Sequence, residues 1–321
     1  MTGTEEKSEV KCSLCETQAT LFLRLIHTDV WECRAPSCGL QFAFPQLGEE
    51  ALARAYSHLY YPPAGNEDGI TFENTPDRVL NQIFQKLEQR LGSLRGLQLL
   101  DYGCGRGKLL RAAKEFGMQP VGIEQDPQAR AIAGRLPGAA IYANASDLRA
   151  AGEIGQFDVI TMWTVIEHLR SPWEDLASLH SLLRPGGSLL ISTMDISCLR
   201  ARIERRRWEN YENPTHLYYF DRISLSRTIQ AAGFSNFSEW RLKLSYDHHG
   251  FARRWLYKMM FDLRLADGLF FVCKRDLQVN SGEDTTGGLH SIASGSSSDG
   301  TWSAPRTTHS RIHTPEKRLE S

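Results

Sequence analysis

Three glycines at alternating positions follow an acidic residue in the stretch "LLDYGCGRGKLL", residues 99–110; the four residues are Asp101, Gly103, Gly105 and Gly107. Leucines on both sides predict a buried strand before the turn and a helix after it. Glycines at such a turn let the backbone approach a ligand closely and adopt dihedral angles that other residues avoid. Lys at position 108 breaks the dinucleotide pattern G-x-G-x-x-G, and Leu at position 109 breaks the phosphate-loop pattern. We therefore expect a ligand that is not bound through either of these phosphate motifs.

An acid at the end of the next strand narrows the choice of ligand. Glu124 ends "PVGIE" and lies 23 positions after Asp101. In doubly wound sheets an acid at this place accepts hydrogen bonds from the hydroxyls of a ribose. A tight turn without a ligand is the alternative, since glycine turns alone are common. Together, the turn and Glu124 favour a ligand with a ribose and no phosphates.

Four of the seven cysteines lie within the first 38 residues, in two pairs separated by 17 residues: Cys12, Cys15, Cys33 and Cys38. Four thiolates on two short turns suit a structural, tetrahedral Zn²⁺, and four ordinary buried cysteines are the alternative. Phe42 and Phe44 follow the second pair, and we expect them to pack this small module onto the main domain. The start "MTGTEEKSEV" is unlike a secretory signal, so a cytoplasmic protein is predicted, in which disulfides are rare.

Composition disfavours several partners. A formal net charge of -1 and a pI near 6.8 give no broad basic surface for nucleic acid. No run approaches the ~18 apolar residues of a membrane span, so none is predicted. From Ser281 on, the chain is rich in Ser, Gly and Thr and cannot bury enough apolar surface to offset its chain entropy, which predicts disorder.

Strand-like apolar runs alternate with amphipathic helical stretches in the middle of the chain, with strands expected at 97–103, 120–124, 139–144, 157–163 and 188–193. Asp126 with Pro127 marks one helix start, a capping box from Ser171 to Glu174 marks another, and "RPGG" at 184–187 ends that helix. Five strand–helix repeats predict an α/β fold with a doubly wound, mostly parallel sheet. The expected regions are a zinc-knuckle module at 1–46, a helical linker or lid at 47–94, the α/β domain at 95–276 and a disordered tail at 277–321.

The stretches "LLDYGCGRGKLL", "VGIEQDP", "FDVITMWTVIEHL" and "LLRPGGSLLIST" resemble, in order and spacing, the motifs of class I S-adenosylmethionine-dependent methyltransferases. The resemblance implies a seven-stranded Rossmann-like sheet whose last strand, in "ADGLFFVCKR", is antiparallel, and S-adenosylmethionine as cofactor. It places Asp101 and the three glycines at the methionine end and Glu124 at the ribose. It also implies that Gln125 borders the adenine, that Asn144 and Ala145 contact its edge, and that Trp163 and Thr164 lie beside the methionine portion.

The combination of the cysteine module with "EHL", "RPGG" and "HLYYF" resembles a bacterial subgroup found among small-molecule and sugar methyltransferases. His168, after the fourth strand, is the candidate general base, and a packed histidine is the alternative. His216, in the cap segment "NPTHLYYF", is the second candidate. It is expected to line the acceptor pocket with Tyr218 and Tyr219, and the alternative is that Tyr218 and Phe220 are core aromatics. Ubiquinone-pathway O-methyltransferases bind a metal with an additional carboxylate at the place of Thr164, so no catalytic metal is predicted here.

Three further groups admit two interpretations each. Tyr56, Tyr60 and Tyr61 form either a lid over the cofactor or an interdomain contact. The five arginines of residues 200–207 form either a solvated helix face or a site for an anionic acceptor such as a nucleotide-sugar. The cluster at 247–249, Asp-His-His, is predicted to be a solvated loop.

These patterns predict an S-adenosylmethionine-dependent methyltransferase that modifies an oxygen or nitrogen of a small molecule, with a sugar or nucleotide-sugar as one candidate. An RNA methyltransferase is the alternative within the enzyme class. A non-catalytic zinc-ribbon scaffold that retains the cofactor fold is the alternative outside it. The sequence leaves the acceptor and the oligomeric state open.

Overall fold

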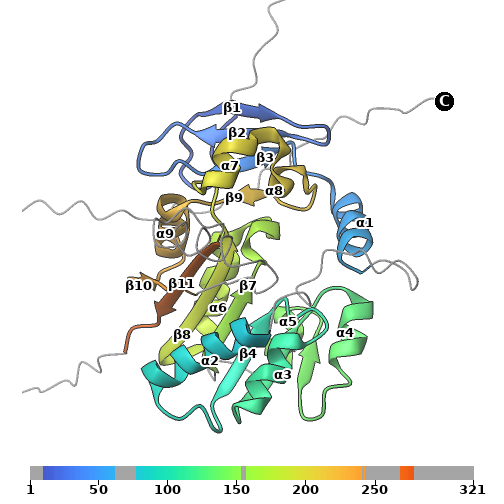
Figure 1. Ribbon diagram of the computed structural model, residues 1–321, viewed down its shortest axis with the longest axis vertical. Coiled ribbons are helices and arrows are strands. Elements are labelled where there is room, and N and C mark those ends of the chain that lie inside the picture. Colours follow the sequence, from blue (N-terminus) through green and yellow to red (C-terminus); the bar gives the residue numbers. More distant parts are fainter. Residues whose placement is uncertain (1–9, 62–76, 153–156, 241, 243–267, 278–321) are drawn as a thin grey trace, which may run out of the picture. The chain divides into compact units, whose positions relative to one another are not determined.

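The computed structural model describes residues 10–61, 77–152, 157–240, 242 and 268–277 (Figure 1). The cluster at 247–249 and the predicted tail beyond position 277 lie outside these residues. The helices are α1 (Glu49–Tyr60), α2 (Asp77–Leu91), α3 (Lys108–Glu115), α4 (Pro127–Ala133), α5 (Ala145–Ala150), α6 (Pro172–Leu182), α7 (Leu199–Glu204), α8 (Glu209–Glu212) and α9 (Arg222–Ala231). None of the helices in the described part of the chain is long and apolar enough to cross a membrane.

Within the described residues the main sheet has seven strands, in the order β10-β11-β8-β7-β4-β5-β6. Their bounds are β4 (Gln98–Tyr102), β5 (Gln119–Ile123), β6 (Ala140–Tyr142), β7 (Phe157–Trp163), β8 (Leu183–Met194), β10 (Asn236–Glu239) and β11 (Gly268–Lys274). The strands β6, β5, β4, β7 and β8, which are neighbours in this order, pair in parallel. The strand β11 is antiparallel to β8, and β10 is antiparallel to β11. This confirms the predicted Rossmann-like sheet and its antiparallel last strand. The strand order reverses beside β4, and ligands bind at such a reversal in doubly wound sheets.

Helices cover both faces of this sheet because consecutive side chains of a strand point to opposite sides. Leu99 of β4 and Val159 of β7 are fully buried in a core built with α2 and α3. Their neighbours Leu100 and Ile160 are fully buried in a second core that includes α6 and α9. The uninterrupted apolar runs seen in the sequence thus reflect burial on both faces.

Two predicted helix signals differ from the structure. Ser171 precedes α6 as expected, but its side chain accepts no capping hydrogen bond, and its ψ of 70° departs from the extended backbone of a capping residue. Asp126, with ψ of 123°, does cap α4 through the N–H groups of Gln128 and Ala129. The strand β8 starts earlier than predicted because Leu183 pairs with β7, so "RPGG" lies within the strand rather than at the helix end.

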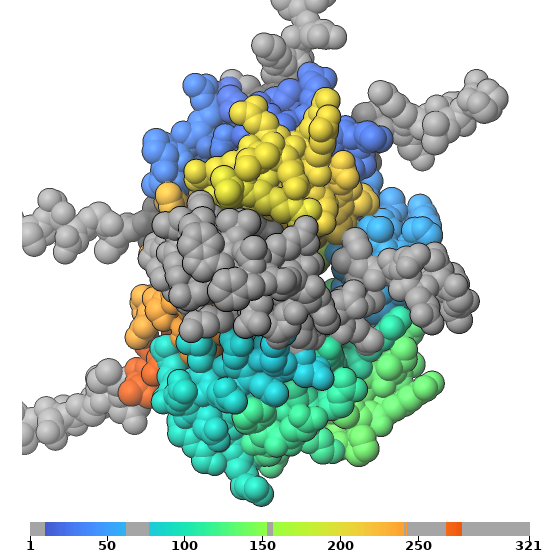
Figure 2. Space-filling view, in the orientation of Figure 1, coloured from blue at the N-terminus to red at the C-terminus, as the bar shows by residue number. Residues whose placement is uncertain are grey.

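In the part of the chain that the structure describes, a second antiparallel sheet contains four strands: β1 (Ala19–Arg24), β2 (Asp29–Cys33), β3 (Gln41–Phe44) and β9 (Tyr218–Tyr219), in that order. The strand β9 comes from the segment after β8, so the cysteine-bearing module shares its sheet with residues far beyond position 46. In Figure 2 the yellow segment with α7 and α8 lies over part of the blue N-terminal segment, and the ring of Tyr211 in α8 contacts that of Phe22 in β1.

Of the two phenylalanines expected at this junction, one lies there. Phe42 is buried and pairs with Tyr218 of β9. Phe44 is 44% exposed and packs edge-on against Trp31 within the small sheet. Because Phe44 keeps this exposure and its ring contact lies within the small sheet, its packing onto the main domain stays a prediction.

Candidate active site and cysteine centre

The glycine turn joins β4 to α3 beside the strand-order reversal. Gly103, Gly105 and Gly107 have φ angles of 80°, 54° and 86°, which L side chains rarely adopt. A Cβ atom on Gly103 would lie 2.5 Å from Cγ2 of Val165. The backbone conformation therefore requires glycine at these positions, and at Gly103 the side chain of Val165 packs directly against the backbone.

Glu124, directly after β5, holds this turn with a buried carboxylate. Its Oε2 accepts the N–H of Gly105 at 2.8 Å and its Oε1 accepts the N–H of Asp126 at 2.8 Å. Burial raises the pKa of Glu124, and these two backbone donors oppose the rise. Each carboxylate oxygen has two acceptor positions, so Glu124 can still receive two hydroxyl groups.

Asp101 is the buried acid of β4 next to the glycines. Burial raises the pKa of Asp101 to about 7, although the hydroxyl of Thr161 donates to its Oδ1 at 2.7 Å. An acid with a pKa near neutrality responds strongly to a nearby cation, which favours the ionised form.

Two cavities meet at the glycine turn, and Tyr56, Gly103 and Val165 line both. The larger has a volume of about 590 Å³, and its lining includes Glu124, Gln125, Asp126, His168 and Thr215. The smaller has a volume of about 60 Å³, and its lining includes Asp101, Gly105, Tyr60, Tyr61, Trp163 and Thr164. A ligand with a ribose at Glu124 could extend from one cavity into the other.

Two residues of the expected cofactor site lie elsewhere in this arrangement. Asn144 and Ala145 line neither of these two cavities. Asn144 caps α5, and its Oδ1 accepts the N–H of Asp147 at 2.9 Å. Their contact with the adenine stays a prediction.

The helix α1 forms a wall of both cavities, since Tyr56 lines both and Tyr60 lines the smaller one. The rings of Tyr56 and Tyr60 both lie edge-on to His168, with centroids 5.6 Å from that ring. Ser57 donates a hydrogen bond of 2.9 Å to Oδ2 of Asp126, which ties α1 to the loop after β5. Sequence reasoning missed Ser57, because only tertiary structure brings it to Asp126.

His168 ends a short 3-10 helix after β7 (Ile166–His168) and lines the larger cavity. Its Nδ1 lies 2.9 Å from the carbonyl oxygen of Thr215. Because a carbonyl only accepts, Nδ1 carries the proton and Nε2 keeps a lone pair. Burial lowers the pKa of His168 to about 4, so the ring is neutral at pH 7.

His216 lies beside His168, with ring centroids 4.8 Å apart, but is almost fully buried. Its Nδ1 is 2.8 Å from the carbonyl oxygen of Asn210, and its Nε2 accepts from the amide of Asn213 at 3.2 Å. Burial lowers the pKa of His216 well below its usual value. Both ring nitrogens are therefore engaged, and His216 lines neither of the two cavities.

Glu167, His168 and His216 place one potential ligand atom each within 4.8 Å of one another. Glu167 is buried, which raises its pKa to about 7, and its Oε2 accepts the hydroxyl of Thr193 at 2.9 Å. A metal bound here would have one carboxylate ligand, that of Glu167. The Nε2 lone pair of His216 already accepts a hydrogen bond from Asn213, so it is not free to bind a metal. The absence of a catalytic metal stays a prediction.

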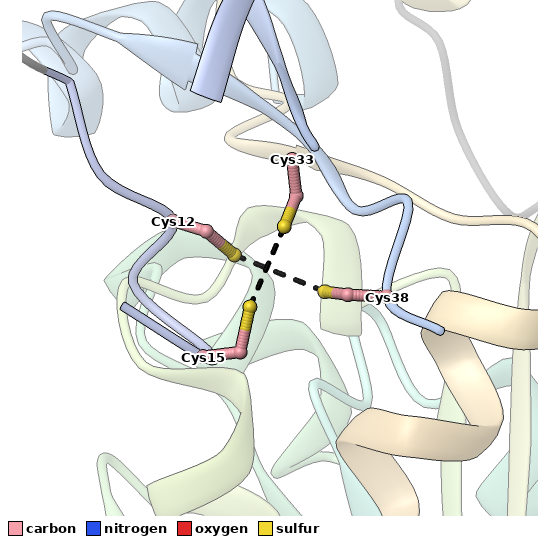
Figure 3. A group of neighbouring side chains, drawn as sticks. All are labelled: Cys12, Cys15, Cys33 and Cys38. Atoms are coloured by element: carbon pink, nitrogen blue, oxygen red, sulfur yellow. Dashed lines mark hydrogen bonds between the residues drawn. The ribbon is translucent and has the colours of Figure 1, made fainter. Parts of the chain in front are cut away.

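The four N-terminal cysteines converge on one point, as Figure 3 shows. The Sγ atoms of Cys12 and Cys38 are 3.9 Å apart and those of Cys15 and Cys33 are 3.4 Å apart. These separations exceed the ~2.05 Å of a disulfide and fit sulfurs that are each about 2.3 Å from a tetrahedral Zn²⁺. The thiol of Cys38 lowers the pKa of Cys12 to about 5, which favours a thiolate there.

The cap segment supplies core residues more than cavity residues. Tyr218 and Tyr219 are buried and line neither of the two cavities. The hydroxyl of Tyr218 donates to the carbonyl of Arg170 at 2.9 Å. Of the five arginines in residues 200–207, Arg200 pairs with Glu204 and Glu209, and none lines either cavity.

Comparison with known proteins identifies the family. The model of the methyltransferase domain matches residues 73–239, just over half of the chain. The ubiquinone biosynthesis O-methyltransferase of Ruegeria pomeroyi is 31% identical over 185 residues, which cover 49% of this chain and 72% of that protein. The protein of the same name from Cereibacter sphaeroides is 35% identical over 128 residues, which cover 37% of this chain and 51% of that protein.

A solved structure with the same fold is the 1,6-didemethyltoxoflavin-N1-methyltransferase of Burkholderia thailandensis, with 1,6-didemethyltoxoflavin and S-adenosylhomocysteine bound. Its TM-score is 0.50 at 16% identity, and the match covers 80% of this chain and 100% of that one. The chain therefore belongs to the methyltransferase-domain family and is a class I S-adenosylmethionine-dependent methyltransferase.

Proposed function

We propose that this chain holds S-adenosylmethionine across the two cavities at the glycine turn. In this arrangement Glu124 receives the ribose hydroxyls and Gln125 borders the adenine, both in the larger cavity. The methionine end lies along the smaller cavity, beside Asp101, Trp163 and Thr164. The left-handed glycines support this proposal, since no side chain projects from these three positions of the turn.

We further propose that the methyl group is transferred to an oxygen of a small molecule and that His168 accepts the proton of that oxygen. The observation that carries this proposal is that Glu124 and His168 line one cavity of about 590 Å³. The bound cofactor supplies the electrophilic methyl group. His168 is neutral at pH 7 with its Nε2 lone pair unprotonated, which suits a proton acceptor.

His168 is a weak base in this setting, because burial holds its pKa near 4. Positioning of acceptor and cofactor must therefore supply most of the rate enhancement. His216 suits the role of base less well, since the amide of Asn213 occupies its Nε2.

The relatives named O-methyltransferases support oxygen over nitrogen as the accepting atom. A sugar or nucleotide-sugar stays a candidate acceptor, but the arginines of residues 200–207 line neither cavity and give an anionic acceptor no support. An RNA methyltransferase and a non-catalytic scaffold are the alternatives that an assay must separate.

The four cysteines are proposed to hold a structural Zn²⁺. Their sulfurs offer four soft donors within 4.8 Å of one another, and four protein ligands leave no open position for catalysis. Reduced thiols of this kind are compatible with the predicted cytoplasmic location.

Methyl transfer from labelled S-adenosylmethionine into fractionated cell extract tests the proposed function. We expect label in a low-molecular-weight fraction, with or without ribonuclease treatment of the extract. Label that is lost to ribonuclease would support the RNA methyltransferase instead. Cofactor binding without transfer to any fraction would support the scaffold.

A further inference from the structure

Asn213 lies in the loop between α8 and β9, and the residue is 7% exposed. Its Oδ1 accepts the N–H of Thr215 at 3.0 Å and the hydroxyl of Thr215 at 2.7 Å. Since the backbone N–H of Thr215 can only donate, the oxygen of the amide must face Thr215. The orientation of the Asn213 amide follows from this contact, so its nitrogen faces the other way.

The nitrogen of this amide reaches Tyr60, which lines the smaller cavity, and His216, which lies beside His168. Nδ2 of Asn213 donates to the hydroxyl of Tyr60 at 2.8 Å and to Nε2 of His216 at 3.2 Å. Tyr60 belongs to α1, the helix that walls both cavities. One buried amide therefore joins α1, the cap segment and the histidine pair.

The oxygen side of Asn213 leads to His168 through one residue. Thr215, which Asn213 holds by two hydrogen bonds, uses its carbonyl oxygen to accept from Nδ1 of His168 at 2.9 Å. That contact selects the tautomer in which Nε2 is the unprotonated nitrogen. The Nδ2 atom of Asn213 also acts on the imidazole ring of His168, because the Tyr60 to which it donates lies edge-on to that ring.

We propose that Asn213 is a positioning residue for methyl transfer, which fixes the tautomer and the orientation of His168 and holds α1 against the cap segment. This inference rests on the proposed function of His168. Asn213 lines neither of the two cavities, so it acts through Thr215 and Tyr60 rather than on the reactants. Among the described residues, the titratable groups around His168 are Glu167, His216, Tyr56 and Tyr60.

The test needs no acceptor. Nitrogen-15 NMR of the imidazole groups reports the tautomer and the pKa of His168, with its resonances assigned by their loss in His168→Gln. In the unaltered protein we expect the Nδ1-protonated tautomer and a pKa of about 4. Asn213→Ala should introduce the other tautomer and move the pKa toward the ~6.5 of an exposed histidine, because the loop that buries the ring loosens.

Asn213→Asp is the matched variant, because it keeps the acceptor for Thr215 and removes the donors to Tyr60 and His216. It should preserve the tautomer and raise the pKa of His168, since a carboxylate favours a charged imidazole nearby. Asn236→Ala, on the exposed edge strand β10, is the control and should leave the His168 signals unchanged.

With labelled cofactor and the active extract fraction, Asn213→Ala should lower turnover by about 10²-fold, the size of effect expected for a misplacement near 1 Å. The affinity for S-adenosylmethionine should stay within about twofold, because Asn213 is not among the residues proposed to bind it. Unchanged tautomer and pKa in Asn213→Ala would overturn the inference, as would an equal loss of turnover and cofactor affinity.

Two outcomes separate this inference from the proposed function. Normal turnover in His168→Ala would remove the role of base, while the NMR result would still decide whether Asn213 positions the ring. If Asn213→Ala fails to fold in a thermal melt, Asn213→Asp decides, and an unaltered pKa of His168 in that variant would count against the inference.

Discussion

The carboxylate of Glu124 accepts the backbone N–H of Gly105 at 2.8 Å, so the acid proposed to bind the ribose also holds the glycine turn. Under this proposal Glu124 would act on the cofactor in two ways, by direct hydrogen bonds and by fixing the backbone of the glycine turn. Both effects should be visible in the binding of S-adenosylmethionine, independent of any acceptor.

Replacement of Glu124 by Ala should weaken S-adenosylmethionine binding by about 1.5–3 kcal/mol, the range for hydrogen bonds to a charged group. Isothermal titration calorimetry measures this difference. Glu88→Ala, at an exposed position of α2, is the matched control and should bind as the unaltered protein does. Equal affinity in the Glu124→Ala variant would remove the ribose assignment.

Asp101 should make cofactor affinity depend on pH. Burial raises its pKa to about 7, and the cationic groups of S-adenosylmethionine favour the ionised carboxylate. Binding should therefore release a proton near and below pH 7, and affinity should rise as pH increases from about 6 to 8. Calorimetry in buffers of different ionisation enthalpy measures the released proton. The Asp101→Asn variant should lose this pH dependence, and if it kept the dependence another group would be responsible.

Purified protein should contain one zinc per chain, and Cys12→Ser or Cys38→Ser should abolish or strongly reduce zinc binding. Metal analysis of freshly purified, reduced protein gives the content. Cys198→Ser is the matched control, because Cys198 is a buried cysteine outside the four-cysteine cluster. Absence of zinc from the unaltered protein would contradict the proposed structural site.

Loss of the metal should affect turnover more than cofactor affinity. Phe42 of β3 pairs with Tyr218 of β9, and Leu217 donates its N–H to the carbonyl of Glu167 at 2.8 Å, next to His168. The cysteine module thus supports the acceptor side of the site rather than the ribose side. A chelated sample should keep S-adenosylmethionine affinity within about twofold and transfer methyl groups more slowly. If affinity fell as far as turnover did, the module would be supporting the whole fold instead.

The main sheet could be predicted from the sequence because its strands are buried on both faces and read as short apolar runs between turn residues. Leu99 and Leu100, which pack on opposite faces, illustrate why this signal is local and strong. The position of β9 could not be predicted. Its two residues pair with Gln41 and Phe42 across most of the chain, and only tertiary structure determines such a contact.

The candidate site was predictable to a similar extent. Asp101, Glu124 and the glycines have motif spacing, and in the structure Asp101, Gly103, Gly105 and Glu124 line two cavities that meet at the glycine turn. The choice between His168 and His216 had no such signal, because it depends on the carbonyl groups of Thr215 and Asn210 and on the amide of Asn213. These contacts set tautomers and burial, which residue types alone do not reveal.

Single-turnover methyl transfer by His168→Ala, with the enzyme in excess over labelled S-adenosylmethionine and the acceptor fraction at saturation, tests the central claim most directly. General-base catalysis predicts a rate about 10²–10⁴-fold below that of the unaltered protein, with the cofactor Kd nearly unchanged. The pH–rate profile of the unaltered protein should fall on the acid side near the His168 pKa of about 4, where the imidazole becomes protonated, and this limb should vanish in the variant. An unaltered single-turnover rate in His168→Ala would contradict the account.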